Sequence, residues 1–94
     1  MRLKGKKAFI TGAAQGIGKS IALAMAREGA DVTVADVKME QATAAAGELE
    51  AFGAKGIAVK LDISLADEVS AAFETHMKEF SGLDILVNNA GITK

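Results

Sequence analysis

The feature that most constrains the fold of this chain is a regular alternation of two sequence patterns. Short runs rich in β-branched and aliphatic residues recur at a nearly constant step, and they occupy Lys7–Thr11, Asp31–Asp36, Gly56–Leu61 and Asp84–Asn88. Each run is too short for a helix and predicts a β-strand. The longer segments between the runs show helical periodicity, so the predicted order of elements is β-α-β-α-β-α-β.

The predicted helices are marked by apolar residues at spacings of three and four. Their apolar stripes are Ile17, Ile21, Ala24 and Met25 in the first, Ala42, Ala45, Leu49 and Phe52 in the second, and Val69, Phe73, Met77 and Phe80 in the third. Gly29 and Gly53 follow the first two helices and are natural C-terminal caps. The third helix is expected over Leu65–Phe80, and Ser64 and Asp67 form a capping-box-like pattern at its start.

Strands that alternate with helices predict an α/β fold with parallel strands joined by right-handed crossovers. We expect a truncated doubly wound, Rossmann-type sheet of four strands and three helices, for which the strand order is 3-2-1-4. Two helices would then cover one face of the sheet and one helix the other. Because neither a linker nor a low-complexity segment interrupts the pattern, residues 1–94 are expected to form a single domain.

The composition argues against several classes of function. Eleven basic and twelve acidic residues leave a formal charge of −1, which suggests neither a nucleic-acid partner nor a membrane surface. The chain has no cysteine and a single histidine, so no metal site is expected, and we interpret His76 as an ordinary residue at the margin of the third helix. No apolar run approaches the roughly 20 residues of a membrane span, and the N-terminus does not resemble a signal sequence, so we expect a cytoplasmic protein.

The segment GAAQGIGKS, residues 12–20, resembles two kinds of phosphate-binding loop. The segment ends in Gly-Lys-Ser, as the P-loop of a nucleoside triphosphatase does. A P-loop also needs a glycine five positions before Gly18, but this chain has Ala13 there. A dinucleotide loop instead uses its glycines for a tight turn, for close approach of the pyrophosphate and for close packing of helix on strand. Gly12, Gly16 and Gly18 suit these roles, with the phosphates at the N-terminus of the first helix. A bare strand-to-helix turn that binds nothing is the alternative.

An acidic residue, Asp36, ends the second predicted strand at the distance from the glycine loop that is typical of dinucleotide-binding folds. A carboxylate at this position can accept hydrogen bonds from both ribose hydroxyls of NAD, whereas it would repel the 2′-phosphate of NADP. The alternative is a strand-end carboxylate that faces solvent. We therefore predict that NAD is preferred over NADP.

These motifs, taken in order, resemble the N-terminal half of the short-chain dehydrogenase/reductase family. The matching segments are Thr11–Gly18, Asp36, Leu61–Ile63 and Asn88–Gly91. By this resemblance the cofactor-binding residues would be Gly12, Gly16, Ile17 and Gly18 at the pyrophosphate, Asp36 at the adenosine ribose, Asp62 and Ile63 at the adenine, and Asn89, Ala90 and Gly91 at the ribose and toward the nicotinamide. Gln15, where NADP-preferring relatives often have a basic residue, also implies NAD, although Lys38 lies near Asp36.

The same resemblance implies that the catalytic residues of the family are absent. The proton donor of the family is a tyrosine, assisted by a lysine and a serine, and all three lie well after the Asn-Asn-Ala-Gly motif. This chain has no tyrosine and stops at Lys94, so we assign no catalytic residue and leave open whether it acts as an enzyme. NAD is expected to bind weakly, because its nicotinamide end would normally rest on later segments.

The resemblance also has consequences for partners. The fourth strand, which is interior in the family, would here be an apolar edge, and such an edge pairs readily with another strand. We expect a homo-oligomer formed through this edge or through the incompletely covered face of the sheet. Two alternatives remain: a separate chain that supplies the C-terminal half and completes a split dehydrogenase, or a self-assembling structural or folding-study fragment without a ligand.

Overall fold

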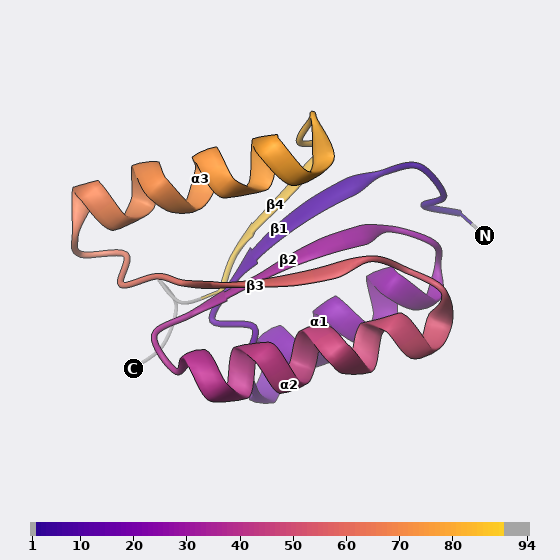
Figure 1. Ribbon diagram of the computed structural model, residues 1–94. Helices are drawn as coiled ribbons and strands as arrows, with labels where there is room; N and C mark the ends of the chain where they lie inside the picture. Colours follow the sequence, from indigo (N-terminus) through magenta and orange to yellow (C-terminus); the bar gives the residue numbers. More distant parts are fainter. Residues whose placement is uncertain (1, 90–94) are drawn as a thin grey trace.

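The computed structural model of the protein describes residues 2–89, which form one parallel sheet flanked by helices (Figure 1). The elements are β1 (Lys7–Thr11), α1 (Gly16–Arg27), β2 (Asp31–Asp36), α2 (Met39–Leu49), the 3₁₀ helix η1 (Glu50–Phe52), β3 (Gly56–Lys60), α3 (Ala66–Phe80) and β4 (Ile85–Asn88). The predicted alternation is confirmed. Two strand ends differ from the prediction by one residue, since β3 ends before Leu61 and β4 begins after Asp84.

The strands are parallel and follow the predicted order, β3-β2-β1-β4. In this register Thr11, the last residue of β1, lies opposite Ala35 of β2 and Asn88 of β4. The carboxyl ends of the three strands therefore meet at one edge of the sheet. The chain leaves β1 at this edge and enters the glycine loop that leads to α1.

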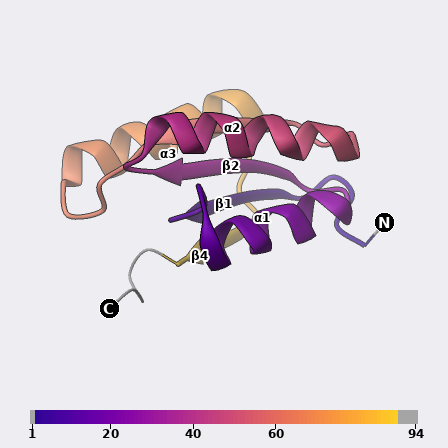
Figure 2. The same cartoon turned by 90° about the horizontal axis from the view of Figure 1, so that it is seen from below.

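Helices α1 and α2 cover one face of the sheet and α3 covers the other (Figure 1). In the view from below, α1 and α2 lie in front of the sheet, and the paler α3 lies behind it (Figure 2). The core on this side is built mostly of short side chains, which include Ala8, Ile10, Val32 and Val34 from the strands and Ala22, Ala26, Ala42, Ala45 and Leu49 from the helices. The core under α3 contains larger rings, and Phe9 of β1 stacks on Phe73 with their centroids 4.3 Å apart.

The buried stripe of α1 differs from the predicted one. Its buried residues are Gly18, Ala22 and Ala26. Of the predicted stripe, Ile17 is 69% exposed and Ala24 is exposed, while Ile21 and Met25 are partly buried. The prediction followed the larger apolar side chains, but α1 lies so close to the strands that small residues face the sheet. The larger residues lie beside this contact.

Helix α3 is also turned relative to the prediction. It begins one residue later than expected, at Ala66, and its buried residues are Ala72, His76 and Phe80. Val69 and Phe73 of the predicted stripe are partly buried against the core, and Met77 is 46% exposed. Phe80 of the predicted stripe is buried as expected. Met77 lies outside the core because the neighbouring His76, counted among the polar residues, faces the sheet.

The capping box predicted for the start of α3 does not form. The Ser64 hydroxyl donates to the Asp62 carboxylate at 2.7 Å, and no side-chain hydrogen bond from the described residues caps the helix start. Glu68 accepts the backbone N–H of Asp62 at 2.8 Å instead. At the other end, the C-cap residue Ser81 adopts the left-handed conformation with φ of 60°, one residue before Gly82.

His76 is a buried core residue, which corrects its predicted place at the helix margin. Its side chain is fully buried, with Nδ1 2.7 Å from the Thr33 hydroxyl and Nε2 2.8 Å from the Gly82 carbonyl oxygen. Because a carbonyl can only accept, Nε2 carries the proton and the Thr33 hydroxyl donates to Nδ1. The ring also meets Phe9 and Phe80 edge-on, with centroid distances of 5.6 and 5.1 Å. His76 therefore joins α3 to β2 and to the turn before β4.

We expect His76→Leu to lower the free energy of unfolding by about 2 kcal/mol, because it leaves the buried Thr33 hydroxyl without its acceptor. Urea unfolding followed by circular dichroism measures this loss. Adding Thr33→Val should restore part of it, since the double variant has no unpaired hydroxyl at this point. A His76→Leu chain as stable as the wild type would show that the two hydrogen bonds contribute nothing net.

Candidate cofactor-binding site

The predicted site residues gather at the carboxyl edge of the sheet. The segments that follow β1, β2, β3 and β4 all lie there, because parallel strands end on the same side. Those within the described part of the chain are Gly12, Gln15, Gly16, Ile17, Gly18, Asp36, Asp62, Ile63 and Asn89. The two other predicted residues, Ala90 and Gly91, lie outside the described residues.

The loop between β1 and α1 needs its glycines for two physical reasons. Gly12 and Gly16 have φ of 62° and 64°, in the left-handed region that side chains disfavour. Gly18 is needed for space, because a Cβ at this position would overlap the Gly12 carbonyl oxygen and lie 2.7 Å from the Asn89 amide nitrogen. The absence of a side chain thus lets the first turn of α1 pack directly against the loop.

The N-terminus of α1 lies at this edge and is open to an anion. Gln15 is the N-cap residue, and its side chain makes no capping hydrogen bond with the described residues. The first turn contains no acidic residue. The amine of Lys19 forms an ion pair with Glu48 of α2 at 2.7 Å. A P-loop lysine would instead point toward the phosphates of a bound nucleotide. The unpaired N–H groups and the helix dipole favour a negatively charged group here.

Side chains from both neighbouring strands hold the loop in place. Asp36, at the end of β2, accepts the backbone N–H of Ala14 through Oδ2 at 3.1 Å. Asn89, which follows β4, donates from Nδ2 to the Gly12 carbonyl oxygen at 3.1 Å. The loop is therefore supported from two sides.

A small hollow of about 110 Å³ opens beside the loop, at the ends of β1, β2 and β3. Its lining residues are Thr11, Gly12, Asp36, Val37, Leu61, Asp62 and Ile63. Val37 and Ile63 are apolar yet 51% and 43% exposed, and a flat ring could cover them. Val37 is not among the residues predicted to form the site. The sequence feature that could have identified it is an apolar residue directly after the aspartate at the strand end, where turn residues are ordinarily polar.

Asp62 contributes an oriented carboxylate to the hollow. The hydroxyl and the backbone N–H of Ser64 both donate to Oδ1, at 2.7 and 3.0 Å. These bonds, aided by the charge of Lys60, hold the pKa of Asp62 below its ordinary value of 3.8. The group is thus ionised at neutral pH and can accept a hydrogen bond from an amino group.

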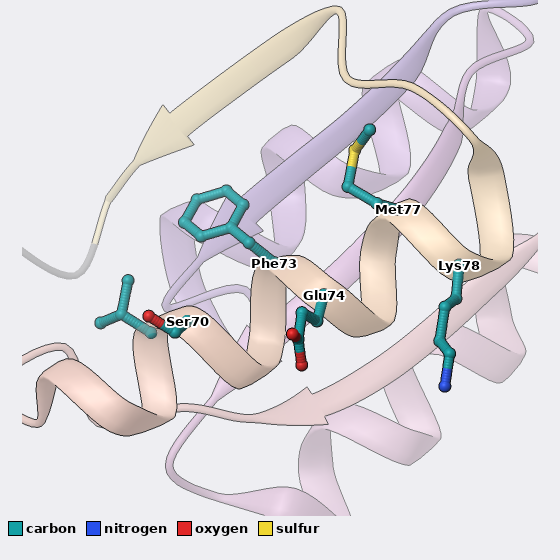
Figure 3. Close-up of a pocket in the computed structure, with 6 residues that line it drawn as sticks. Ser70, Phe73, Glu74, Met77 and Lys78 are labelled. Atoms are coloured by element: carbon teal, nitrogen blue, oxygen red, sulfur yellow. The ribbon is translucent and has the colours of Figure 1, made fainter.

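A further surface depression lies away from this edge, along α3 (Figure 3). It has a volume of about 760 Å³ and is lined by Val69, Ser70, Phe73, Glu74, Met77 and Lys78. Phe73 and Met77 point toward the side where β4 runs, whereas Glu74 and Lys78 point away from it (Figure 3). None of the predicted cofactor-binding residues lines this depression.

Three ion pairs form between charged side chains in the described part of the chain. The ion pairs are Lys7 with Asp31, Lys19 with Glu48 and Lys55 with Glu79. Within residues 2–89, no group of three or more histidine, aspartate and glutamate side chains is placed to hold a metal ion.

Comparison with known proteins gives close similarity over nearly the whole chain. The family model described as short chain dehydrogenase matches residues 6–94. Galactitol 2-dehydrogenase of Agrobacterium fabrum is 48% identical over 92 residues, which are 98% of this chain and 35% of that protein. The crystal structure of a hydroxysteroid dehydrogenase from Escherichia coli superposes with a TM-score of 0.92 at 42% identity, over 96% of this chain and 37% of the other.

A further solved structure contains a cofactor. It is a 7α-hydroxysteroid dehydrogenase complexed with NADH and 7-oxo glycochenodeoxycholic acid, and it superposes with a TM-score of 0.90 at 40% identity. The match covers 93% of this chain and 34% of that one. The chain therefore spans about a third of the length of the proteins that it matches, and it corresponds to their N-terminal part.

We expect Gly18→Ala to destabilise the chain by about 1–3 kcal/mol, because the new methyl group meets backbone that cannot rotate away. Gly47→Ala is the matched control, since Gly47 lies in α2 and a Cβ there has nothing within 4 Å. This control should raise stability by about 0.5–1 kcal/mol through helix propensity. Urea unfolding of both variants gives the comparison, and equal effects would contradict the close packing of α1 on the loop.

Proposed function

The chain belongs to the short-chain dehydrogenase family, and from this we propose that it is the NAD-binding, N-terminal part of an NAD-dependent oxidoreductase. The observation that carries the proposal is the glycine loop held between Asp36 and Asn89, with the uncapped N-terminus of α1 behind it. A dinucleotide requires an anion site, an acceptor for ribose hydroxyls and a surface for the adenine. These three features lie side by side at the carboxyl edge of the sheet.

Each part of the cofactor has residues suited to it. The proposed contacts are Gly12, Gly16, Ile17 and Gly18 with the pyrophosphate, Asp36 with the adenosine ribose, Asp62 and Ile63 with the adenine, and Asn89, Ala90 and Gly91 with the ribose and toward the nicotinamide. The pyrophosphate would accept hydrogen bonds from the first turn of α1. The adenine would lie in the hollow, where its amino group could donate to Asp62.

Preference for NAD over NADP rests on the charge at the end of β2. Asp36 is partly buried there, so a 2′-phosphate would meet a carboxylate that is not fully screened by water. Gln15 is exposed and neutral, and it offers no charge to offset that repulsion. The side chain of Lys38 is exposed, although its backbone N–H donates to Asp36 at 3.0 Å.

The proposed reaction needs groups beyond those described. When bound, the nicotinamide ring accepts or donates a hydride. The residues of this chain bind and orient the cofactor, but the chain contains no tyrosine, the proton donor that the resemblance implies. We therefore propose that proton transfer depends on residues outside these 94, from a longer chain or from a second chain that supplies a C-terminal half.

We further propose that the chain self-associates through β4. This strand pairs with β1 on one side and is at the end of the sheet order, and its Leu86 is 55% exposed. An apolar edge strand with unpaired backbone groups is a template for another strand.

The cellular location stays a prediction. No helix within residues 2–89 is long and apolar enough to cross a membrane. The cytoplasm, expected from the sequence, is the location that we propose.

Calorimetric titration tests the choice of cofactor. We expect NAD to bind at least about tenfold more tightly than NADP. Asp36→Ala should weaken NAD by more than about tenfold and remove most of the preference, since the loss of a single hydrogen bond to a charged group already costs about 1.5 kcal/mol or more.

Glu40→Ala removes an exposed carboxylate on α2 and serves as the matched control that should leave both affinities unchanged. Unchanged NAD affinity in a folded Asp36→Ala chain would exclude the proposed role of Asp36. Magnesium-dependent binding of ATP in preference to NAD would overturn the assignment of the loop.

Sedimentation velocity tests the proposed self-association. We expect the wild type to sediment as a dimer or larger species and Leu86→Lys to shift it toward monomer, because a lysine on an edge strand hinders strand pairing. Leu83→Lys, at a residue that is 38% exposed in the turn before β4, is the control and should leave the association unchanged. A well-folded wild-type monomer at high concentration would refute pairing through β4.

A further inference from the structure

Both carboxylate oxygens of Asp36 are already engaged by backbone N–H groups. Oδ2 accepts from Ala14 in the glycine loop at 3.1 Å, and Oδ1 accepts from Lys38 at 3.0 Å. An ionised carboxylate offers about four acceptor positions on its two oxygens. Two positions therefore remain for the two hydroxyls of a ribose, and the same group can serve the protein and the ligand together.

The bond to Ala14 links β2 to the loop through a side chain, and it is the one such hydrogen bond among residues 2–89. The preceding residue, Ala13, donates its N–H to the backbone carbonyl of Ala35 at 3.3 Å, and any residue at position 35 would preserve that bond. Ala14 is 4% exposed, so in the wild type water has little access to its N–H and the carboxylate is its partner. The next residues, Gln15 and Gly16, begin the helix turn that faces the anion site.

We infer that Asp36 is a positioning residue for the pyrophosphate-binding loop as well as the acceptor for the ribose. This inference rests on the proposed function and deepens it. The carboxylate fixes the loop two residues before α1, and thereby sets where the first-turn N–H groups stand relative to the phosphates. A change at position 36 then affects phosphate binding even when the ligand has no ribose hydroxyl to offer.

The role of Asp36 in positioning the loop can be distinguished from its role as ribose acceptor by changing the ligand and the protein in the same experiment. The probes are ADP and 2′,3′-dideoxy-ADP, titrated by calorimetry into the wild type, Asp36→Ala and Asp36→Asn. Asparagine retains an amide oxygen that can accept from Ala14 but carries no charge, whereas alanine provides no acceptor. The exposed N–H of Lys38 can bind water in either variant.

We expect Asp36→Ala to bind dideoxy-ADP about tenfold more weakly than the wild type, which is the effect of losing one hydrogen bond that orders the loop. Asp36→Asn should bind it at least as tightly as the wild type, because the bond to Ala14 is kept and a negative charge near the phosphates is removed. Equal affinity of wild type and Asp36→Ala for dideoxy-ADP, with only ADP weakened, would overturn the inference while leaving the proposed function intact. If the wild type bound neither nucleotide, the proposed function would fail and the inference with it.

Amide hydrogen exchange of the wild type keeps the inference testable if Asp36→Ala does not fold. The N–H of Ala14 lies outside the helices and strands, and we expect it to be protected as strongly as the neighbouring N–H of Ala13. Exchange of Ala14 at the rate of an unstructured amide, with Ala13 protected, would overturn the inference. Loss of the protection in Asp36→Ala and its retention in Asp36→Asn would support it.

Discussion

The close approach of α1 to the end of β1 is the contact on which the rest of the site depends. Gly18 has no side chain, and this absence allows the first turn of the helix to rest against the Gly12 carbonyl and the Asn89 side chain. The N–H groups of that turn therefore lie at the same edge of the sheet as Asp36. Because the helix is so near the strands, the residues beneath it are small, and the core on this face is rich in alanine.

The two faces of the sheet are held by different means. Short aliphatic side chains fill the face under α1 and α2, where close packing supplies the contact. Under α3, the stacked rings of Phe9 and Phe73 and the buried His76 supply both packing and hydrogen bonds. His76 also holds the turn that leads into β4, so the strand that places Asn89 beside the loop depends on the far end of α3. The geometry of the site therefore depends on the packing of helices on both faces of the sheet.

The sequence predicted the positions of the strands well because β-branched runs bounded by polar residues have few other structures open to them. It also predicted the buried face of α2, where Ala42, Ala45 and Leu49 are buried, but it misplaced the buried faces of α1 and α3. Hydrophobic spacing predicted that Ile17 and Met77 are core residues, but both are exposed. Helix α1 lies so close to the sheet that only small side chains fit between them. In α3, His76 rather than Met77 is buried, because both of its ring nitrogens form hydrogen bonds. The capping box at Ser64 did not form because the nearer Asp62 carboxylate takes its hydroxyl.

The sequence by itself determined the alternation of strands and helices, the glycine positions and the acidic end of β2, since these depend on local backbone preference and on spacing along the chain. Tertiary structure decided which atoms meet. It brought the Ala14 N–H to Asp36, the Asn89 amide to Gly12 and the His76 ring to Thr33, pairs separated by 22, 77 and 43 positions. Such contacts follow from the register of the parallel strands and from how closely each helix lies on the sheet, and neither quantity is encoded in a local pattern.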